Sequence, residues 1–119
     1  EEDIEKVKEY GRNHFRFATK LYNLQYELGL YFLHEHPRGA TSWQEEGIRK
    51  LAGKEGVRTV DSNMCVYGMT QEVNGKNMLV KKPTKFLTNA GCIADRLNVQ
   101  CQGGHKHITL LGGISRSAM

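Results

Sequence analysis

The chain has 119 residues, of which 39% are hydrophobic and 25% are charged. This composition is typical of a globular domain and excludes the disordered class, and no apolar run is long enough to span a bilayer. We expect a single domain over residues 1–119, with a Gly- and His-rich tail over residues 99–119. The chain opens on an acidic helical pattern without an initiator Met, so we also expect it to be a piece of a longer protein.

Charge and cysteine content limit the partners and the compartment. The formal net charge of +4 permits contact with nucleic acid but does not require it. The three cysteines are an odd number without regular spacing, which argues against a disulfide framework. They predict an intracellular, reducing compartment, the cytoplasm or the nucleus.

The first half of the chain shows a helix, a strand and a second helix. Apolar residues at helical spacing predict a long helix over residues 1–28, ended by Gly29 as its C-terminal cap. The run "LYFLHEH", residues 30–36, is rich in β-formers and lacks alternation, which predicts a strand buried on both faces. The segment "QEEGIRKLAG", residues 44–53, predicts a short helix with Ser42 as a plausible N-cap.

The second half is predicted to contain a pair of strands. The segment "VRTVDSNMCVYGM", residues 57–69, predicts one strand or a strand plus a turn, and "NMLVKKPTKFLTN", residues 77–89, predicts another. The connection "TQEVNGK" between them contains the hairpin turn signal Asn74-Gly75, so we expect antiparallel neighbours. A last helix is expected over residues 92–97. Helices that alternate with strands, followed by an antiparallel hairpin, place the chain in the α/β class.

The strand that ends in His34, Glu35, His36 and Pro37 is the first candidate site. Side-chain alternation puts the two histidines on one face and Glu35 on the other, and one interpretation is that these groups simply reach solvent. The other interpretation is functional. If the strand is parallel to a neighbour, Glu35 lies where open α/β sheets bind ligands, and Pro37 fixes its backbone.

A second candidate site is the C-x3-H-x-H pattern formed by Cys101, His105 and His107. Thiolate and imidazole groups are zinc ligands, and either Cys92 or Cys65 offers a fourth. The spacing departs from the common zinc-finger patterns, and an exposed polar tail is the alternative.

The segment "KKPT", residues 81–84, also has two interpretations. Lysine and proline together protect an edge strand from pairing with other chains. Alternatively, Lys82 and Thr84 contact a phosphate or a base.

Taken together, "FLHEHP", "NMCVYGM" and "KKPTKFLTN" resemble the second half of the catalytic domain in DNA cytosine-5 methyltransferase-like proteins of the divergent phage and mobile-element type. In that family a strand ends in Glu-Asn-Pro or Glu-Asn-Val, and His36 replaces the Asn here. Divergent members continue with C-x-YG, KPT and a strand that ends in TN, which match Cys65, Tyr67, Gly68, Lys82, Pro83, Thr84, Thr88 and Asn89. The tail "GGHKH…LLGGISRSA" is similar to the close of retroelement-linked relatives.

The resemblance covers roughly residues 15–119 and implies a partial Rossmann-like, methyltransferase-type sheet with flanking helices. It implies S-adenosylmethionine as the cofactor and DNA as the partner. Glu35 would be the catalytic carboxylate that hydrogen-bonds a flipped cytosine. The residues that it implies for substrate binding are His36, Pro37, Tyr67, Lys82, Thr84 and Asn89.

The Pro-Cys nucleophile segment and the S-adenosylmethionine loop of that family have no counterpart in this chain. We therefore expect no methylation by this chain alone. Two alternatives stay open: a non-catalytic nucleic-acid-binding module that depends on Lys81, Lys82 and Lys85, and a zinc-stapled structural or assembly domain. Missing sheet neighbours would leave an apolar edge, so we expect a homo-oligomer or a partner chain to cover it.

Overall fold

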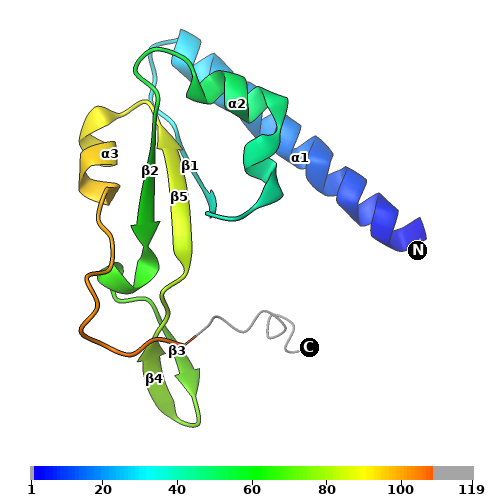
Figure 1. Ribbon diagram of the computed structural model, residues 1–119. Helices are drawn as coiled ribbons and strands as arrows, with labels where there is room; N and C mark the ends of the chain where they lie inside the picture. The colour runs from blue at the N-terminus through cyan, green and yellow to red at the C-terminus, as the bar shows by residue number, and fades with distance from the viewer. Residues whose placement is uncertain (1, 109–119) are drawn as a thin grey trace.

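The structure is a computed structural model that describes residues 2–108. Over this range it is a mixed α/β fold with two antiparallel sheets and three α-helices (Figure 1). The helices are α1 (Glu2–Glu27), α2 (Glu46–Ala52) and α3 (Gly91–Leu97), and two short 3-10 turns are η1 (Thr41–Gln44) and η2 (Met64–Tyr67). The strands are β1 (Leu33–Pro37), β2 (Arg58–Asn63), β3 (Thr70–Val73), β4 (Lys76–Leu79) and β5 (Pro83–Thr88).

The main sheet has the order β1-β5-β2, and the central strand β5 is antiparallel to both neighbours. The second sheet is the β3–β4 hairpin, whose turn residues Asn74 and Gly75 have φ values of 54° and 79°. Positive φ at both turn positions is the geometry that Asn-Gly favours. The predicted antiparallel pairing is confirmed for β2 and β5. Residues 57–69 form a strand followed by a turn, whereas residues 77–89 divide into β4 and β5, and β4 pairs with β3 from the segment predicted as the connection.

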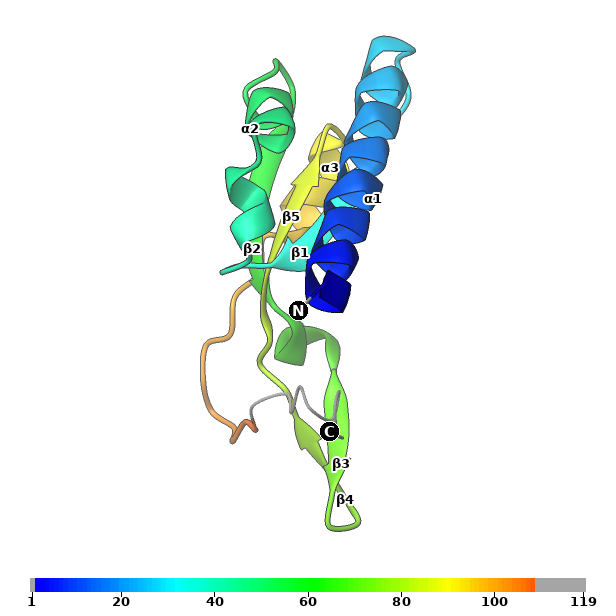
Figure 2. The ribbon, with the colours of Figure 1, turned by 90° about the vertical axis from the view of Figure 1, so that its right-hand side faces the viewer.

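The helices cover both faces of the main sheet, as Figures 1 and 2 show. Leu87 of β5 points toward α1 and α2, and the neighbouring Phe86 points toward α3. The larger core cluster lies on the first side and consists of Phe32, Trp43, Ile48, Leu51, Val57 and Leu87. The smaller cluster, under α3, consists of Val60, Phe86 and Ala94.

The prediction that β1 is buried on both faces is wrong. His34 is 6% exposed on the inner face, whereas Leu33 on the other face is 45% exposed. The reason is that α3 packs on β2 and β5 and does not cover the edge strand β1. The pairing of β1 with β5 is antiparallel, so among the described strands Glu35 does not lie at the carboxyl end of a parallel pair.

The helix boundaries follow the sequence closely, with one exception. α1 ends as predicted, because Gly29 adopts a φ of 76° and the Leu30 amide donates to the Gln25 carbonyl at 2.7 Å. The predicted Ser42 cap is wrong: Ser42 lies in η1, and Glu45 occupies the N-cap position of α2. The predicted last helix is confirmed as α3.

The predicted tail is only partly described. Residues 99–107 form no helix or strand, and the segment "LLGGISRSA", residues 110–118, lies outside the described residues. None of the described helices combines the length and the apolar character that crossing a membrane requires.

Candidate metal centre

The first ligand of the candidate metal centre comes from η2, directly after β2. Cys65 in this turn is only 5% exposed. The Gly68 amide donates to the Cys65 carbonyl at 3.0 Å, and Gly68 ends the turn with a φ of 83°. A short turn that ends at a glycine thus fixes the backbone of Cys65 while its sulfur faces the C-terminal segment.

The other ligands come from the irregular segment that follows α3. The Ser62 hydroxyl donates to the Val99 carbonyl at 3.0 Å, and the Cys101 amide donates to the Asn63 side chain at 2.8 Å. These bonds place Cys101 beside the end of β2. Gly103 and Gly104 then both adopt positive φ, 87° and 85°, which bends the chain back on itself.

The four candidate ligand atoms of Cys65, Cys101, His105 and His107 all lie within 4.8 Å of one another. The Cys101 sulfur is 3.5 Å from Nε2 of each histidine, and the Cys65 sulfur is 3.2 Å from Nε2 of His107. Zinc bonds of about 2.3 Å to sulfur and about 2.0 Å to nitrogen, at tetrahedral angles, separate such atoms by about 3.5 Å. The arrangement therefore fits a tetrahedral ion.

One distance in the cluster departs from that geometry. Nε2 of His105 and Nε2 of His107 are 2.8 Å apart, whereas two nitrogen ligands of a tetrahedral zinc ion are about 3.4 Å apart. The imidazole rings meet edge to face, with centroids 4.4 Å apart. The two nitrogens would have to separate by about 0.6 Å to bind one zinc ion.

Local charges show what a cation would change at this centre. Burial raises the pKa of the Cys65 thiol, and its hydrogen bond with Cys101 and the charge of Cys101 raise the pKa further. Desolvation lowers the pKa of His107, as do the positive charges of His105 and Lys81. A bound dication would lower the pKa of the Cys65 thiol, because metal coordination stabilises thiolates. It also requires the neutral imidazole that the lowered pKa of His107 favours.

The structure selects one of the two predicted fourth ligands. Cys65 joins the cluster, whereas Cys92 is exposed on α3 and lies outside it. The sequence argument that His105 and His107 point to opposite faces holds only for an extended chain. The Gly103-Gly104 pair was the sequence signal for the bend that brings both rings together.

Glu35 and Lys82 also come together. Lys82 Nζ lies 3.7 Å from a carboxylate oxygen of Glu35, on the face of β1 that α3 leaves open. Lys82 has a φ of 35°, a left-handed conformation that non-glycine residues rarely adopt, directly before Pro83. Thr84 is fully buried, and its hydroxyl donates to the Lys82 carbonyl at 3.0 Å. Thr84 therefore holds this turn in place.

The other predicted substrate residues do not gather around Glu35. His36 points to the opposite face of β1, beside Phe15. The Tyr67 hydroxyl donates to the Leu97 carbonyl at 3.3 Å. The Pro37 carbonyl accepts a hydrogen bond of 2.9 Å from the indole of Trp43.

Asn89 lies at the far end of β5 and joins two segments. Its side-chain oxygen accepts from the Phe32 amide at 3.0 Å, and its side-chain nitrogen donates to the Leu30 carbonyl at 2.9 Å. Both bonds tether the chain as it enters β1. The role that these contacts give Asn89 is structural.

The three lysines of "VKKPTKF" also diverge. Lys81 lies near the Cys/His cluster, where its charge acts on Cys65 and His107. Lys82 pairs with Glu35, and Lys85 sits over the Trp43 ring at 5.2 Å on the opposite sheet face. A single basic strip built from all three is therefore not formed.

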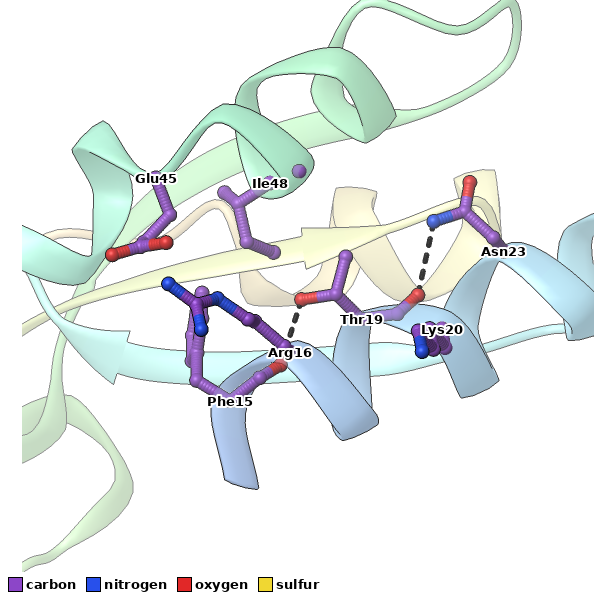
Figure 3. Close-up of a pocket in the computed structure, with 8 residues that line it drawn as sticks. Phe15, Arg16, Thr19, Lys20, Asn23, Glu45 and Ile48 are labelled. Atoms are coloured by element: carbon purple, nitrogen blue, oxygen red, sulfur yellow. Dashed lines mark hydrogen bonds between the residues drawn. The ribbon is translucent and has the colours of Figure 1, made fainter. Parts of the chain in front are cut away.

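A hollow of about 280 Å³ between α1 and α2, shown in Figure 3, was missed by sequence reasoning. Two of its polar side chains are satisfied by α1 itself: the Thr19 hydroxyl donates to the Phe15 carbonyl at 2.9 Å, and the Asn23 amide donates to the Thr19 carbonyl at 3.0 Å. Beside it, a Cβ on Gly47 would lie 3.2 Å from the Thr19 methyl group. The hollow therefore lies next to the point where α1 and α2 approach each other closely.

No protein-family model, curated protein or solved structure matches this chain. Function must therefore be argued from the arrangement of its own residues. Within residues 2–108, the Cys/His group is the cluster whose geometry fits a metal ion.

Proposed function

We propose that the chain is a structural zinc-binding domain, in which Cys65, Cys101, His105 and His107 hold one Zn²⁺. The convergence of these four ligand atoms within 4.8 Å supports the proposal most directly. Two sulfur and two nitrogen ligands fill all four tetrahedral positions. A closed set of this kind is typical of structural zinc, because catalytic zinc keeps one position for water or substrate.

A bound zinc ion would also stabilise the part of the molecule that lies beyond the main sheet. We call η2, the β3–β4 hairpin and the C-terminal segment, residues 64–81 and 98–108, the distal lobe, and the remaining described residues the sheet lobe. Both buried apolar clusters lie in the sheet lobe. The distal lobe contributes buried Cys65 and Val80, and few other side chains in it are covered.

Simple magnitudes indicate that hydrogen bonds alone do not hold the C-terminal segment. Ordering a residue costs about 1–2 kcal/mol of backbone entropy, so the ten residues or so of this segment cost on the order of 10–20 kcal/mol. Its links to the rest of the chain include the Val99 and Cys101 bonds and the Ile108 amide bond to Leu79 at 2.9 Å. Each contributes only about 0.5–1.5 kcal/mol net. Structural zinc contributes about 10–16 kcal/mol in zinc-finger peptides, which is of the size required.

The experiment that tests the proposal is metal analysis of the purified chain, together with Co²⁺ substitution. We expect one zinc per chain and the absorption bands of tetrahedral thiolate-bound cobalt. Cys101→Ser and His107→Gln should lose both signals. Cys92→Ser and His14→Gln are matched controls, because both residues are exposed and lie outside the cluster, and these variants should keep both signals.

Two outcomes would overturn the zinc proposal. One is a folded wild-type chain that takes up neither zinc nor cobalt. The other is metal binding that survives loss of Cys101 as well as it survives loss of Cys92.

We propose as a second candidate function the recognition of nucleic acid by a methyltransferase-like sheet, with Glu35 and Lys82 at the contact. The main sheet would then be a remnant of a Rossmann-like, methyltransferase-type sheet whose S-adenosylmethionine-binding part is not in this chain. The observation that favours this candidate is the positive φ of Lys82. A positive φ before proline is costly, and a half-exposed ion pair at 3.7 Å returns less than about 1 kcal/mol. Strain of this kind is concentrated at functional sites.

Titration of a cytosine-containing oligonucleotide and of S-adenosylmethionine tests the second candidate. Glu35→Ala and Lys82→Ala should each weaken oligonucleotide binding. Glu46→Ala and Lys50→Ala remove a comparable ion pair on the exposed surface of α2 and should leave binding unchanged. Equal effects from both pairs, or no binding by the wild type, would reject this candidate.

A further inference from the structure

α1 presents two different apolar faces. Phe15, Thr19, Tyr22 and Tyr26 line the face that packs on the sheet lobe, and all four are buried or half-buried. Successive residues of a helix are separated by about 100°, so positions two residues further along lie on nearly the opposite face. Phe17, Leu21, Leu24 and Leu28 occupy these positions and are 44–64% exposed.

The exposed face continues through the whole helix at alternating intervals of three and four residues. The positions, in chain order, are Val7, Tyr10, His14, Phe17, Leu21, Leu24 and Leu28, and all are exposed. This spacing is the a/d heptad pattern that forms the seam of a coiled coil. We call these seven residues the outer seam. An apolar stripe this long on one exposed face indicates a helical partner.

The first half of α1 adds a second observation. Residues 3–14 are exposed on every side, and Figure 1 shows this part of the helix projecting away from the sheet lobe. An isolated helical stretch of this length is marginal in water. A partner along the outer seam would stabilise it.

We propose that the outer seam pairs with the same seam of a second copy of this chain, as an antiparallel coiled coil. In this register Val7 meets Leu24 of the second copy, Tyr10 meets Leu21, and His14 meets Phe17. All of the a and d positions from Val7 to Leu24 thus find a partner in one alignment. Because the seam lies nearly opposite the face that packs on the sheet lobe, the two sheet lobes lie on the outside of the dimer.

Charge favours the antiparallel direction over the parallel one. Residues 1–9 carry five acidic and two basic side chains, whereas residues 10–27 carry three basic and one acidic. Parallel pairing would set the two acidic N-terminal stretches side by side, whereas antiparallel pairing separates them. Antiparallel pairing also places Lys6 beside Glu27 of the second copy, at the flanking positions that select partners, whereas parallel pairing would place Lys6 beside Gly11.

The area is sufficient for a specific dimer. Six paired side chains per helix, at roughly 100 Å² each, bury on the order of 1,200 Å² in total, which is at the lower end of the range of specific protein interfaces. The interface uses no residue of the Cys/His cluster. The dimer can therefore be tested independently of the zinc proposal.

Sedimentation velocity of the full chain over a concentration series tests the dimer. We expect a species of twice the 13.5 kDa chain mass. The double variant Leu21→Glu with Leu24→Glu should sediment as a monomer, and the projecting half of α1 should lose helical circular dichroism. Leu30→Glu is the matched control, because Leu30 is 53% exposed, compared with 55% for Leu24, and lies off the seam. This variant should remain dimeric.

A charge exchange tests the direction. Lys6→Glu and Glu27→Lys should each weaken the dimer several-fold, and the double variant should restore it, because the pair forms again with its signs reversed. A monomeric wild type at every concentration, or a dimer that survives both leucine changes, would overturn the proposal. Failure of the double variant to restore binding would overturn the antiparallel register.

Discussion

The sheet lobe and the distal lobe are ordered by different forces. In the sheet lobe, Ile48, Leu51 and Leu87 are almost fully buried between the sheet and two helices. In the distal lobe, the buried group at the centre is Cys65, and its neighbours are a second thiol and two imidazoles. An apolar core orders a chain without any ligand, whereas a cluster of metal-binding side chains orders it only when the ligands share an ion. The two lobes are therefore expected to respond to different perturbations.

The largest effect confined to the sheet lobe is expected from Leu87→Ala. Leu87 is fully buried on β5, the central strand of the main sheet, and such truncations cost about 2–5 kcal/mol of unfolding free energy. Denaturant titration measures the loss, and Leu30→Ala at an exposed position should cost much less. The cobalt spectrum of the folded variant should be unchanged, and a changed spectrum would show that the two lobes are not separate.

Asn89→Ala is expected to have the next largest effect. The side chain joins the Phe32 amide and the Leu30 carbonyl, and removal leaves both groups without this partner. We expect a loss of about 1–3 kcal/mol in unfolding free energy, measured by thermal or denaturant unfolding. Asn77→Ala, at an exposed position of β4, is the control. An unchanged stability with weakened oligonucleotide binding would instead make Asn89 a substrate residue.

The smallest effect is a pH dependence carried by His34. Burial lowers the pKa of His34, and the positive charge of His36 lowers it further, against a smaller opposing effect of Glu35. The Tyr22 hydroxyl, whose pKa is raised by burial, stays protonated and shares a hydrogen bond of 3.0 Å with Nδ1 of the ring. The unfolded chain therefore binds a proton more readily than the folded one below the ordinary histidine pKa of about 6.5.

It follows that stability from His34 is fully present above pH about 6.5 and is lost as the pH falls toward the lowered pKa of the folded state. Unfolding free energies measured in denaturant at several pH values should show this decline in the wild type. The decline should be shallower in His34→Gln and should persist in His36→Gln. All three proteins should be compared with a chelator present, so that proton-linked metal release does not contribute. An equal decline of unfolding free energy with falling pH in all three proteins would show that His34 does not cause it.

Local sequence signals predicted the features that depend on a few neighbouring residues. Gly29 predicted the end of α1, and Asn74-Gly75 predicted the hairpin, because each signal is a backbone preference of the residues themselves. The pattern of Cys101, His105 and His107 predicted three residues of the candidate metal centre, because these residues are close in sequence. Cys65 remained one of two alternatives, since only the fold brings η2 beside the C-terminal segment.

Features that depend on which element covers which face could not be predicted. The run from Leu30 to His36 has no alternation, yet β1 is buried on one side only, because α3 does not reach the edge of the sheet. The separation of Lys82 from Lys85 likewise follows from the alternation of β5 and from the position of Trp43. The methyltransferase resemblance stays a prediction.

Hydrogen exchange measured with zinc bound and with a chelator present tests the division between the lobes most directly. With zinc removed, amides of residues 64–81 and 98–108 should exchange rapidly, because the ligands no longer share an ion. Amides of β1, β2 and β5 should keep their protection, because their core lies in the sheet lobe. An unchanged pattern after zinc removal, or loss of protection throughout the chain, would contradict the division.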